Sequence, residues 1–466
     1  MSALPAEPRS NFRSGERAVR WRRLLGPLAT LTASFGTFGF FAIQGILLAR
    51  LLGPEMRGAF AAAILFPQAL LYLGLLGAPE LFAGYAAKGL DNAGLRRTAA
   101  RYGLLAGLLS LAVCIGLDFL LIRDEFRWVL PLACLCAVAL PLQQIRLAVQ
   151  AVDHGQRELL RYNQGRLLAA AAFPLTLVLA YALGITTLPW ICGLFVTSQA
   201  AALLLAQRGM QHSWHGRGAV PIPKALRHAK PLIAAWFASE LLERLDMVLM
   251  LTLISDQATL GYYAAAVPMA ALLIIVPNSA SLYAFNLGAR SNEIPTVAAV
   301  WRILLGGFLI QVVSAGILAV SLPWLINLFY GDRFAPTVVF AWLLLPAGMF
   351  RGLLQALDGY LRARGKAVTG VVARSIGLGV LVGLAALLPL AFRYWDLPPA
   401  YAIPVALSAA LGVCFFFLAA VVLKDVATHH ANNPSNTTNS TATNSTATKN
   451  ATDLDSTPPV SGRRKA

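Results

Sequence analysis

Twelve long apolar runs follow one another from residue 26 to residue 423. Each is about 20 residues long, the length that a helix needs to cross the hydrocarbon core of a bilayer. Because the backbone finds no water to bond with in that core, each crossing is expected to be helical. The predicted spans are residues 26–49, 59–85, 102–122, 128–149, 167–184, 189–206, 231–254, 262–285, 300–328, 337–357, 367–391 and 400–423. The connections between them are short, so the chain is predicted to be an all-α polytopic membrane protein.

The composition agrees with a lipid environment. Of the 466 residues, 58% are hydrophobic and 13% are charged, whereas a typical soluble protein has about 25% charged residues. All five cysteines lie within apolar runs, without the spacing of a disulfide framework or a metal site, and are predicted to be buried thiols. The sequence contains no phosphate-binding loop, nucleophile elbow or zinc motif. No enzyme, no cofactor and no metal are therefore predicted.

The formal net charge of +17 is explained by membrane topology and does not require a nucleic-acid partner. Segments on the side of the N-terminus carry 30 of the 38 Lys and Arg residues, and the opposite loops carry 6. Because Lys and Arg gather on the side that is not translocated, both termini are predicted to be cytoplasmic, with the protein multi-pass in the cytoplasmic membrane. Residues 1–25 form a basic cytoplasmic head, and the Asn/Thr/Ser-rich tail at 424–466 is expected to be disordered.

An internal duplication relates the two halves of the chain. Residues 141–153 and 346–358 both fit P-x4-R-x3-Q-A-x-D, at an offset of 205. The turns before the second and eighth spans also match, since both read Gly-x-x-Ala-Ala-Ala from Gly58 and from Gly261. We therefore predict two tandem six-helix bundles around a central cavity, an arrangement typical of transporters. The bundles are residues 26–206 and 231–423, joined by a cytoplasmic linker at 207–230.

The seventh predicted span carries four charged residues near its middle, namely Glu240, Glu243, Arg244 and Asp246. A charge at the bilayer centre costs roughly 2.5–3.5 kcal/mol on insertion scales, so these residues must face protein or a wet cavity. At about 100° per residue they share one face of the helix. Our preferred interpretation is the wall of a substrate path, in which the three carboxylates line the cavity or couple to an ion. A structural ion-pair cluster between the two halves is the alternative.

The duplicated motif places Arg146 and Gln150 in one half and Arg351 and Gln355 in the other. A spacing of four puts each pair on one helix face. Guanidinium donates two parallel hydrogen bonds to phosphate and keeps its charge, so each half is predicted to offer one arginine to a diphosphate headgroup at the cytoplasmic mouth. Arg374, near the start of the eleventh span, is a candidate of the same kind. Alternatively, these side chains reach lipid phosphates or cap helix ends.

Several short motifs resemble those of a known family. The segment Ile46-Leu-Leu-Ala-Arg-Leu-Leu-Gly-Pro54, followed by Gly58, looks like the opening of Wzx-type polysaccharide flippases, which belong to the multidrug/oligosaccharidyl-lipid/polysaccharide exporter superfamily. Later parts of that pattern are similar to Asp246 with residues 260–264, to residues 328–332 and to residues 355–366. The resemblance covers roughly residues 24–423.

The resemblance implies a V-shaped cavity between two bundles. It also implies transfer of polyprenyl-diphosphate-linked oligosaccharides to the outer leaflet, for lipopolysaccharide or another surface polysaccharide. Cationic cavity residues would hold the lipid headgroup, a role that falls here on Arg50, Arg146, Arg244, Arg351 and Arg374, of which only Arg50 lies in a family motif. For Arg50, near the outer end of the first span, a purely structural anchoring role is the alternative. The expected partners are the lipid-linked oligosaccharide, membrane lipids, and the polymerase and glycosyltransferases of the same pathway.

Two other functions remain open. An ion-coupled multidrug exporter of the same superfamily needs an anionic cavity, which the carboxylates of the seventh span permit and the accompanying arginines disfavour. A non-transporting membrane scaffold for an envelope-assembly complex is the alternative from a different class. The charges within the spans argue against a scaffold, because a scaffold has no use for their cost.

Overall fold

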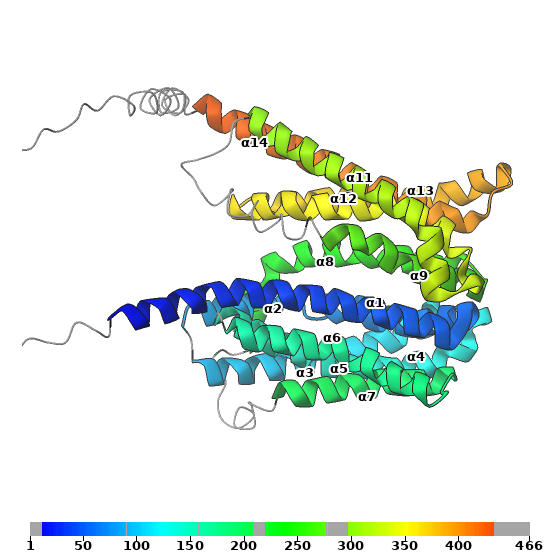
Figure 1. The fold of residues 1–466 in the computed structure, drawn as a ribbon, viewed down its shortest axis with the longest axis horizontal. Helices are drawn as coiled ribbons and strands as arrows, with labels where there is room; N and C mark the ends of the chain where they lie inside the picture. Colours follow the sequence, from blue (N-terminus) through cyan, green and yellow to red (C-terminus); the bar gives the residue numbers. More distant parts are fainter. Residues whose placement is uncertain are drawn as a thin grey trace, which may run out of the picture.

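The computed structural model describes residues 12–89, 91–156, 158–207, 220, 222–275, 277 and 297–432. Every regular element in these ranges is a helix. The first and last described residues, Phe12 and Asn432, lie at the same end of the molecule (Figure 1). This end is termed the terminal face, and the opposite end is termed the distal face.

Two helical bundles follow each other along the chain. The N-terminal bundle comprises α1 (Phe12–Leu73), α2 (Ala78–Ala87), α3 (Asn92–Leu121), η1 (Asp124–Val129), α4 (Leu130–Ala137), α5 (Ala139–Gly155), α6 (Leu159–Ala182) and α7 (Leu188–Gln207). The C-terminal bundle comprises α8 (Ile222–Leu253), α9 (Gln257–Ala271), η2 (Leu272–Ile274), α11 (Val297–Tyr330), η3 (Asp332–Phe334), α12 (Thr337–Ala363), α13 (Ala367–Tyr394), η4 (Pro399–Tyr401) and α14 (Ala402–Asn432). The predicted all-α architecture of two tandem bundles is confirmed.

Ten helical segments of the described residues are long and apolar enough to cross a membrane, so the chain is a multi-pass membrane protein. The first segment accounts for two crossings, because α1 turns back at Gly53, where φ is 69° and ψ is 178° (Figure 1). Glycine adopts this backbone conformation readily, whereas other residues do not. α8 is not among the ten, since charged residues interrupt its apolar sequence, yet it runs alongside the other spans (Figure 1). The twelve predicted crossings are thus present in the predicted order.

Several helices extend past the predicted spans at the terminal face. α3 begins at Asn92 instead of 102, and α6 begins at Leu159 instead of 167. The Asp91 carboxylate caps α3 by accepting hydrogen bonds from the backbone N–H groups of Ala93 and Gly94, at 3.3 and 2.8 Å. Hydropathy detects contact with lipid, whereas capping groups of this kind decide where a helix begins. The predicted boundaries were therefore too short at this face.

The predicted head, linker and tail are described only in part. Residues 12–25 of the basic head belong to α1, and α14 continues to Asn432, so the tail predicted as disordered from residue 424 begins as a helix. Residues 1–11, residues 433–466 and most of the linker lie outside the described residues. The cytoplasmic location of the terminal face remains a prediction.

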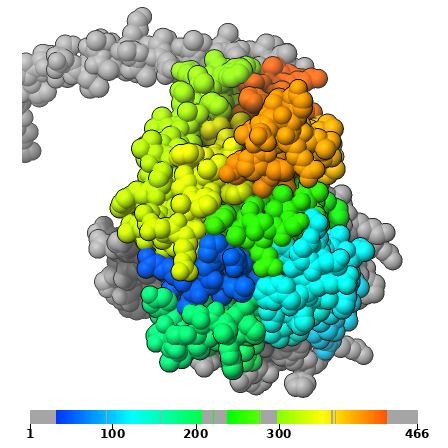
Figure 2. All heavy atoms as spheres, turned by 90° about the vertical axis from the view of Figure 1, so that its right-hand side faces the viewer, coloured from blue at the N-terminus to red at the C-terminus, as the bar shows by residue number. Residues whose placement is uncertain are grey.

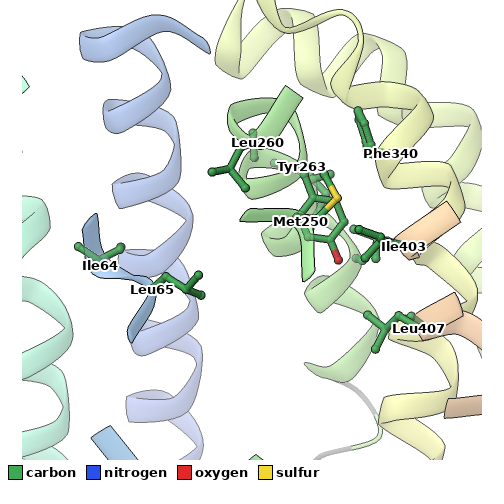
Figure 3. Packing of buried hydrophobic residues seen from close by; sticks show 14 of the residues in the cluster. Ile64, Leu65, Met250, Leu260, Tyr263, Phe340, Ile403 and Leu407 are labelled. Atoms are coloured by element: carbon green, nitrogen blue, oxygen red, sulfur yellow. The ribbon is translucent and has the colours of Figure 1, made fainter. Parts of the chain in front are cut away.

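Buried apolar side chains form a continuous cluster through both bundles. Figure 3 shows the part of this cluster where α1, α8, α9, α12 and α14 come together. The labelled residues are Ile64, Leu65, Met250, Leu260, Tyr263, Phe340, Ile403 and Leu407. Because α8 and α9 stand between α1 and the rest of the C-terminal bundle, they form the junction of the two bundles.

α1 and α9 pack backbone to backbone near the distal face. A Cβ atom at Gly58 would lie 2.0 Å from the carbonyl oxygen of Gln257, and a Cβ atom at Gly261 would lie 2.0 Å from that of Pro54. Only glycine fits at either position without moving the helices apart. The two contacts are equivalent under the duplication, so the matched turns of the two halves pack against each other.

An arginine joins the bundles beside this contact. Arg50 of α1 donates hydrogen bonds from Nε to the carbonyl oxygen of Phe329, at 2.8 Å, and from Nη2 to that of Leu328, at 2.7 Å. Both acceptors lie in the last turn of α11, where backbone carbonyls have no partner within the helix. A cation at the C-terminal end of a helix is also favoured by the helix dipole.

Two further hydrogen bonds cross between the bundles at the distal face. Arg123 donates to the carbonyl oxygen of Thr252 at 3.3 Å, and the Gln257 side chain donates to that of Glu125 at 3.2 Å. Figure 2 views the molecule from this face, with the blue segment of α1 lying against the C-terminal bundle. The distal face is therefore closed by direct contact between the two bundles.

Replacing Gly58 with Ala is expected to disturb this contact, because the added methyl group overlaps the Gln257 carbonyl oxygen. Overpacking of this kind costs about 1–3 kcal/mol. Thermal unfolding in detergent should show the loss. Spin labels at the exposed positions Asp124 and Asp332 should report a longer distance between the bundles.

Gly116→Ala is the matched control, since no atom lies within 4 Å of a Cβ atom at that position. It should leave both the unfolding temperature and the spin-label distance close to wild type. Equal behaviour of the two variants would show that the α1–α9 contact tolerates a side chain and does not close the distal face.

Candidate functional site

The charged residues of α8 lie at the junction of the bundles. α8 contacts α1, α2 and α3 of the N-terminal bundle, and α9, α13 and α14 of its own. Glu240 and Asp246 are buried, Arg244 is half-buried and Glu243 is exposed. The structure therefore covers most of this charged face with protein, as the energetic cost of charges in lipid requires.

Asp246 is held by a tyrosine from the neighbouring helix. The hydroxyl group of Tyr263 on α9 donates a hydrogen bond to the Asp246 carboxylate at 2.5 Å. Tyr263 is fully buried, and its ring meets that of Phe340 edge to face with 6.0 Å between the centroids. α9 also carries Gly261, so the hydrogen bond connects the charged face of α8 to the helix that closes the distal face.

Arginines of the C-terminal bundle converge on the same face of α8. The carboxylate of Glu240 interacts electrostatically with Arg244 on its own helix, with Arg351 on α12 and with Arg374 on α13. Asp246 also interacts with Arg351 and Arg244. Three helices thus bring their charged side chains to one place in this bundle.

The N-terminal bundle contributes Arg146 and Tyr72. Tyr72, near the end of α1, interacts electrostatically with Arg146 of α5 and with Glu240 and Arg244 of α8. The site therefore draws on both bundles. Sequence analysis missed Tyr72 because a single tyrosine in an apolar run carries no signal of its own.

The two duplicated arginine–glutamine pairs have different surroundings. Arg146 donates a hydrogen bond from Nη1 to Oε1 of Gln150 at 3.4 Å, so the predicted pair is in contact. Arg351 Nε and Gln355 Oε1 are buried and have no hydrogen-bond partner among the described residues. The repeat therefore preserves these residue types without preserving their contacts.

The two arginines of the repeat lie at different depths from the terminal face. Arg351 lies near the middle of α12, about 18 Å of helix from its end at Ala363. Arg146 lies about 14 Å from the end of α5 at Gly155. Arg146 is therefore nearer to the terminal face than Arg351 is, and their placement at the cytoplasmic mouth stays a prediction.

Arg374 is paired with Asp358, the last residue of the second copy of the repeat. The Arg374 guanidinium makes an ion pair with the Asp358 carboxylate, and both side chains are largely buried. In the first copy, Asp153 is paired in the same way with Arg96 and with Arg161. The repeat motif contained both aspartates, but their role as structural partners of arginines was not recognised from the sequence.

Arg50 lies apart from the other candidates. Its guanidinium binds two backbone carbonyls at the distal face, as described above. The sequence contains a signal for this role, because Arg50 lies near the distal end of its predicted span. The structural role was the alternative to the substrate-binding role that the family resemblance implied.

The converging side chains carry balanced formal charge. The four arginines are Arg146, Arg244, Arg351 and Arg374, and the four carboxylates are Glu240, Glu243, Asp246 and Asp358. Asp358 is committed to Arg374. The remaining three carboxylates are all on α8, so the local charge changes by one unit whenever one of them gains or loses a proton or binds a cation.

No family model and no curated protein sequence matches the chain. Solved structures do match its fold. A multidrug resistance MATE family transporter of the MOP superfamily, in an inward-facing conformation, has a TM-score of 0.68 at 12% identity, over 85% of this chain and 96% of that one. The lipid II flippase MurJ, in an inward closed conformation, has a TM-score of 0.69 at 15% identity, over 88% and 90%. An outward-facing structure of a MATE transporter of the MOP superfamily has a TM-score of 0.60 at 13% identity, over 86% and 96%.

These likenesses show that the chain has the two-lobe, all-helical fold of MOP superfamily transporters. The sequence-based expectation of a Wzx-type member is supported at the level of this superfamily fold. At identities of 12–15% the likeness defines the arrangement of helices and leaves the substrate to be argued from the residues of the site.

Replacing Asp358 with Asn is expected to destabilise the protein by about 3–5 kcal/mol, because it leaves the largely buried Arg374 without its counter-charge. The double variant Asp358→Asn/Arg374→Gln should recover most of that loss. Asp124→Asn is the control, since Asp124 forms an exposed pair with Arg127 at 2.7 Å that contributes about 0–1 kcal/mol. Thermal unfolding in detergent measures all three, and equal effects of Asp358→Asn and Asp124→Asn would contradict the expectation.

Proposed function

We propose that the protein is a flippase that moves polyprenyl-diphosphate-linked oligosaccharides across the cytoplasmic membrane by alternating access. In this proposal, the product supplies the assembly of a cell-surface polysaccharide. The polymerase and glycosyltransferases of that pathway would be its functional partners. The terminal face would be cytoplasmic and would receive the substrate.

One observation carries this proposal. Arg244 and Arg351 interact with the carboxylates of α8, and Tyr72 interacts with both Arg146 of the N-terminal bundle and that face of α8. The Nε–H group of each of the three arginines is buried with no hydrogen-bond partner among the described residues. A buried donor without an acceptor costs about 1–3 kcal/mol. A phosphate group offers only acceptors, and guanidinium matches its geometry. A diphosphate headgroup between these arginines would therefore satisfy donors that the protein leaves unpaired.

The closed distal face supports an alternating mechanism. The contacts of Gly58, Gly261 and Arg50 join the bundles on the distal side of the arginines. A substrate bound among the arginines would be separated from the distal side in this state. Parting of the bundles at that face would then release it.

The carboxylates of α8 offer a way to couple transport to an ion. While Glu240 and Asp246 are ionised, they offset the charges of Arg244 and Arg351. Uptake of a proton or a cation by one of them would leave a net positive charge for the anionic headgroup. Substrate binding and ion binding would then favour each other, as reciprocal coupling requires.

An ion-coupled multidrug exporter is the second candidate function. The three carboxylates of α8 favour it, because they are as numerous as the three arginines that are not paired with Asp358. For a cationic drug to bind, however, the positive charges of Arg146, Arg244 and Arg351 would have to be moved or neutralised. The anionic lipid-linked substrate therefore agrees better with the donors that lack partners.

Vesicles that contain the purified protein should transfer a labelled undecaprenyl-diphosphate oligosaccharide between leaflets faster than empty vesicles do. The variant Arg146→Gln/Arg351→Gln should transfer it at least about tenfold more slowly, since a hydrogen bond to a charged group contributes about 1.5–3 kcal/mol. Leaflet transfer is measured from the fraction of label that an impermeant quencher reaches.

Arg127→Gln/Arg333→Gln is the matched control, because both arginines are exposed at the distal face. Like the test variant, it removes two positive charges. It should transfer the labelled lipid at the wild-type rate. Wild-type transfer by the Arg146/Arg351 variant would reject the headgroup role. Efflux of cationic dyes in the absence of lipid transfer would assign the protein to the exporter function.

Replacing Asp246 with Asn should make transfer insensitive to an imposed proton or sodium gradient. Asparagine retains an oxygen for the Tyr263 hydroxyl group, so the α8–α9 contact should persist. Glu243→Gln is the companion variant, since this exposed side chain has greater access to water. If lipid transfer by the Asp246→Asn variant responds to the gradients as transfer by the wild type does, Asp246 has a structural role only.

A further inference from the structure

A cavity lies in the N-terminal bundle, between α5, α6 and α7. Its volume is about 520 Å³. Polar and charged groups line it from α5, from α6 and from the turn between them, namely Arg146, Gln150, Asp153, Glu158, Arg161 and Gln164. Leucines of α6 and α7 complete the wall. Arg146 is its only residue shared with the site between the bundles, and the fold and the comparisons assign the cavity no role.

The inner end of the cavity presents hydrogen-bond donors without acceptors. Gln150 is 6% exposed, and its Oε1 atom accepts the hydrogen bond from Arg146. The Nε2 group of Gln150 takes no part in that hydrogen bond. Neither Gln150 Nε2 nor Arg146 Nε has a partner among the described residues. Gly165 of α6 makes room for this amide, because a Cβ atom there would lie 2.6 Å from Gln150 Nε2.

The carboxylates of the cavity are already engaged. Asp153 forms ion pairs with Arg96 and with Arg161, the latter at 3.6 Å, and Glu158 forms one with Arg96 at 3.2 Å. Among the described residues, no carboxylate lies within ion-pair distance of Arg146. The cavity therefore retains one uncompensated guanidinium and one free amide donor, which together favour an anion that only accepts hydrogen bonds.

The outer end of the cavity is apolar and faces the membrane. Leu160 and Leu168 of α6 and Leu205 of α7 are exposed. The exposed stripe continues along α6 through Leu175 and Leu179. Since Leu160 lies in the first turn of α6 and Leu168 in the third, the cavity lies near the terminal face, at the depth of lipid headgroups and the first acyl carbons of that leaflet.

We propose that this cavity binds the phosphate headgroup of an anionic phospholipid from the leaflet at the terminal face. Arg146 and the Gln150 amide contact the phosphate, Arg161 lies beside it, and the acyl chains follow the leucine stripe of α6. The volume is in the range of small-molecule sites, about 300–1,000 Å³. A phosphate headgroup fits within it, and in this proposal the lipid is a resident ligand and not the transported one. Because Arg146 also belongs to the headgroup site of the proposed function, the resident lipid and the substrate would compete for its Nε–H group.

The full-length protein is delipidated in detergent and titrated with phosphatidylglycerol, and binding is counted by native mass spectrometry. We expect one tightly bound phosphatidylglycerol, with at least fivefold weaker binding of phosphatidylethanolamine. Leu168→Trp should weaken the binding of phosphatidylglycerol at least fivefold by filling the mouth of the cavity. Leu175→Trp, the matched control, should bind as wild type does. Both leucines are lipid-exposed on the same helix, at 41% and 61%, and only Leu168 lines the cavity.

Gln150→Leu tests the polar end separately, because it keeps the volume and removes the amide donor. It should also weaken phosphatidylglycerol binding, with an unfolding temperature close to that of Leu175→Trp. Equal binding of the two phospholipids by wild type would overturn the proposal, as would equal binding by the Leu168 and Leu175 variants. Tighter binding of undecaprenyl phosphate than of phosphatidylglycerol, lost in Leu168→Trp alone, would overturn the resident role and make the cavity an entrance for substrate.

Discussion

The backbone contact between α1 and α9 determines how the two bundles meet. Gly58 and Gly261 bring each helix against a carbonyl oxygen of the other, so the helices cannot approach further and cannot carry side chains there. The hydrogen bonds around this contact use acceptors at helix ends, such as the carbonyls of Leu328 and Phe329. These acceptors lack helical partners, and water can replace Arg50 when the bundles separate. The closed distal face is therefore held by interactions that can be exchanged at modest cost.

The charged face of α8 depends on this junction. A helix with four charges near its middle is stable in a membrane only if protein or water covers that face. The N-terminal bundle supplies part of the cover, since α1 contacts α8 and places Tyr72 close to Glu240 and Arg244. Tyr263 and the Asp358–Arg374 pair satisfy some of the charges within the C-terminal bundle. The arginines whose Nε groups have no partner among the described residues are the part of this arrangement that packing alone does not explain.

The sequence predicted the crossings because lipid exposure requires long apolar runs, which are easily recognised. It predicted the two bundles because the motif of the first half is repeated in the second. It did not predict helix ends, since these depend on single capping groups such as Asp91. The duplication identified Gly58 and Gly261 as equivalent, but equivalence within a repeat does not reveal that two residues touch. The hydrogen-bond partners of Arg50 are backbone carbonyls. Backbone carbonyls leave no mark in a pattern of side chains, so the sequence could not identify these partners. Tyr263 and Asp358 were visible as polar residues in apolar helices, yet their pairing required the packing of neighbouring helices.

In the proposed function, the position of Arg146 and Arg351 would link closure of the distal face to binding. Arg146 belongs to the N-terminal bundle and Arg351 to the C-terminal bundle, so any rotation that separates Gly58 from Gly261 also changes the distance between the two guanidinium groups. A ligand that contacts both is held in one arrangement of the bundles and loses a contact in the other. Such a difference in affinity is the only means by which a ligand can shift a conformational equilibrium. In the proposed function, the duplication therefore provides more than two similar halves, because it divides the phosphate-binding groups between the two bundles.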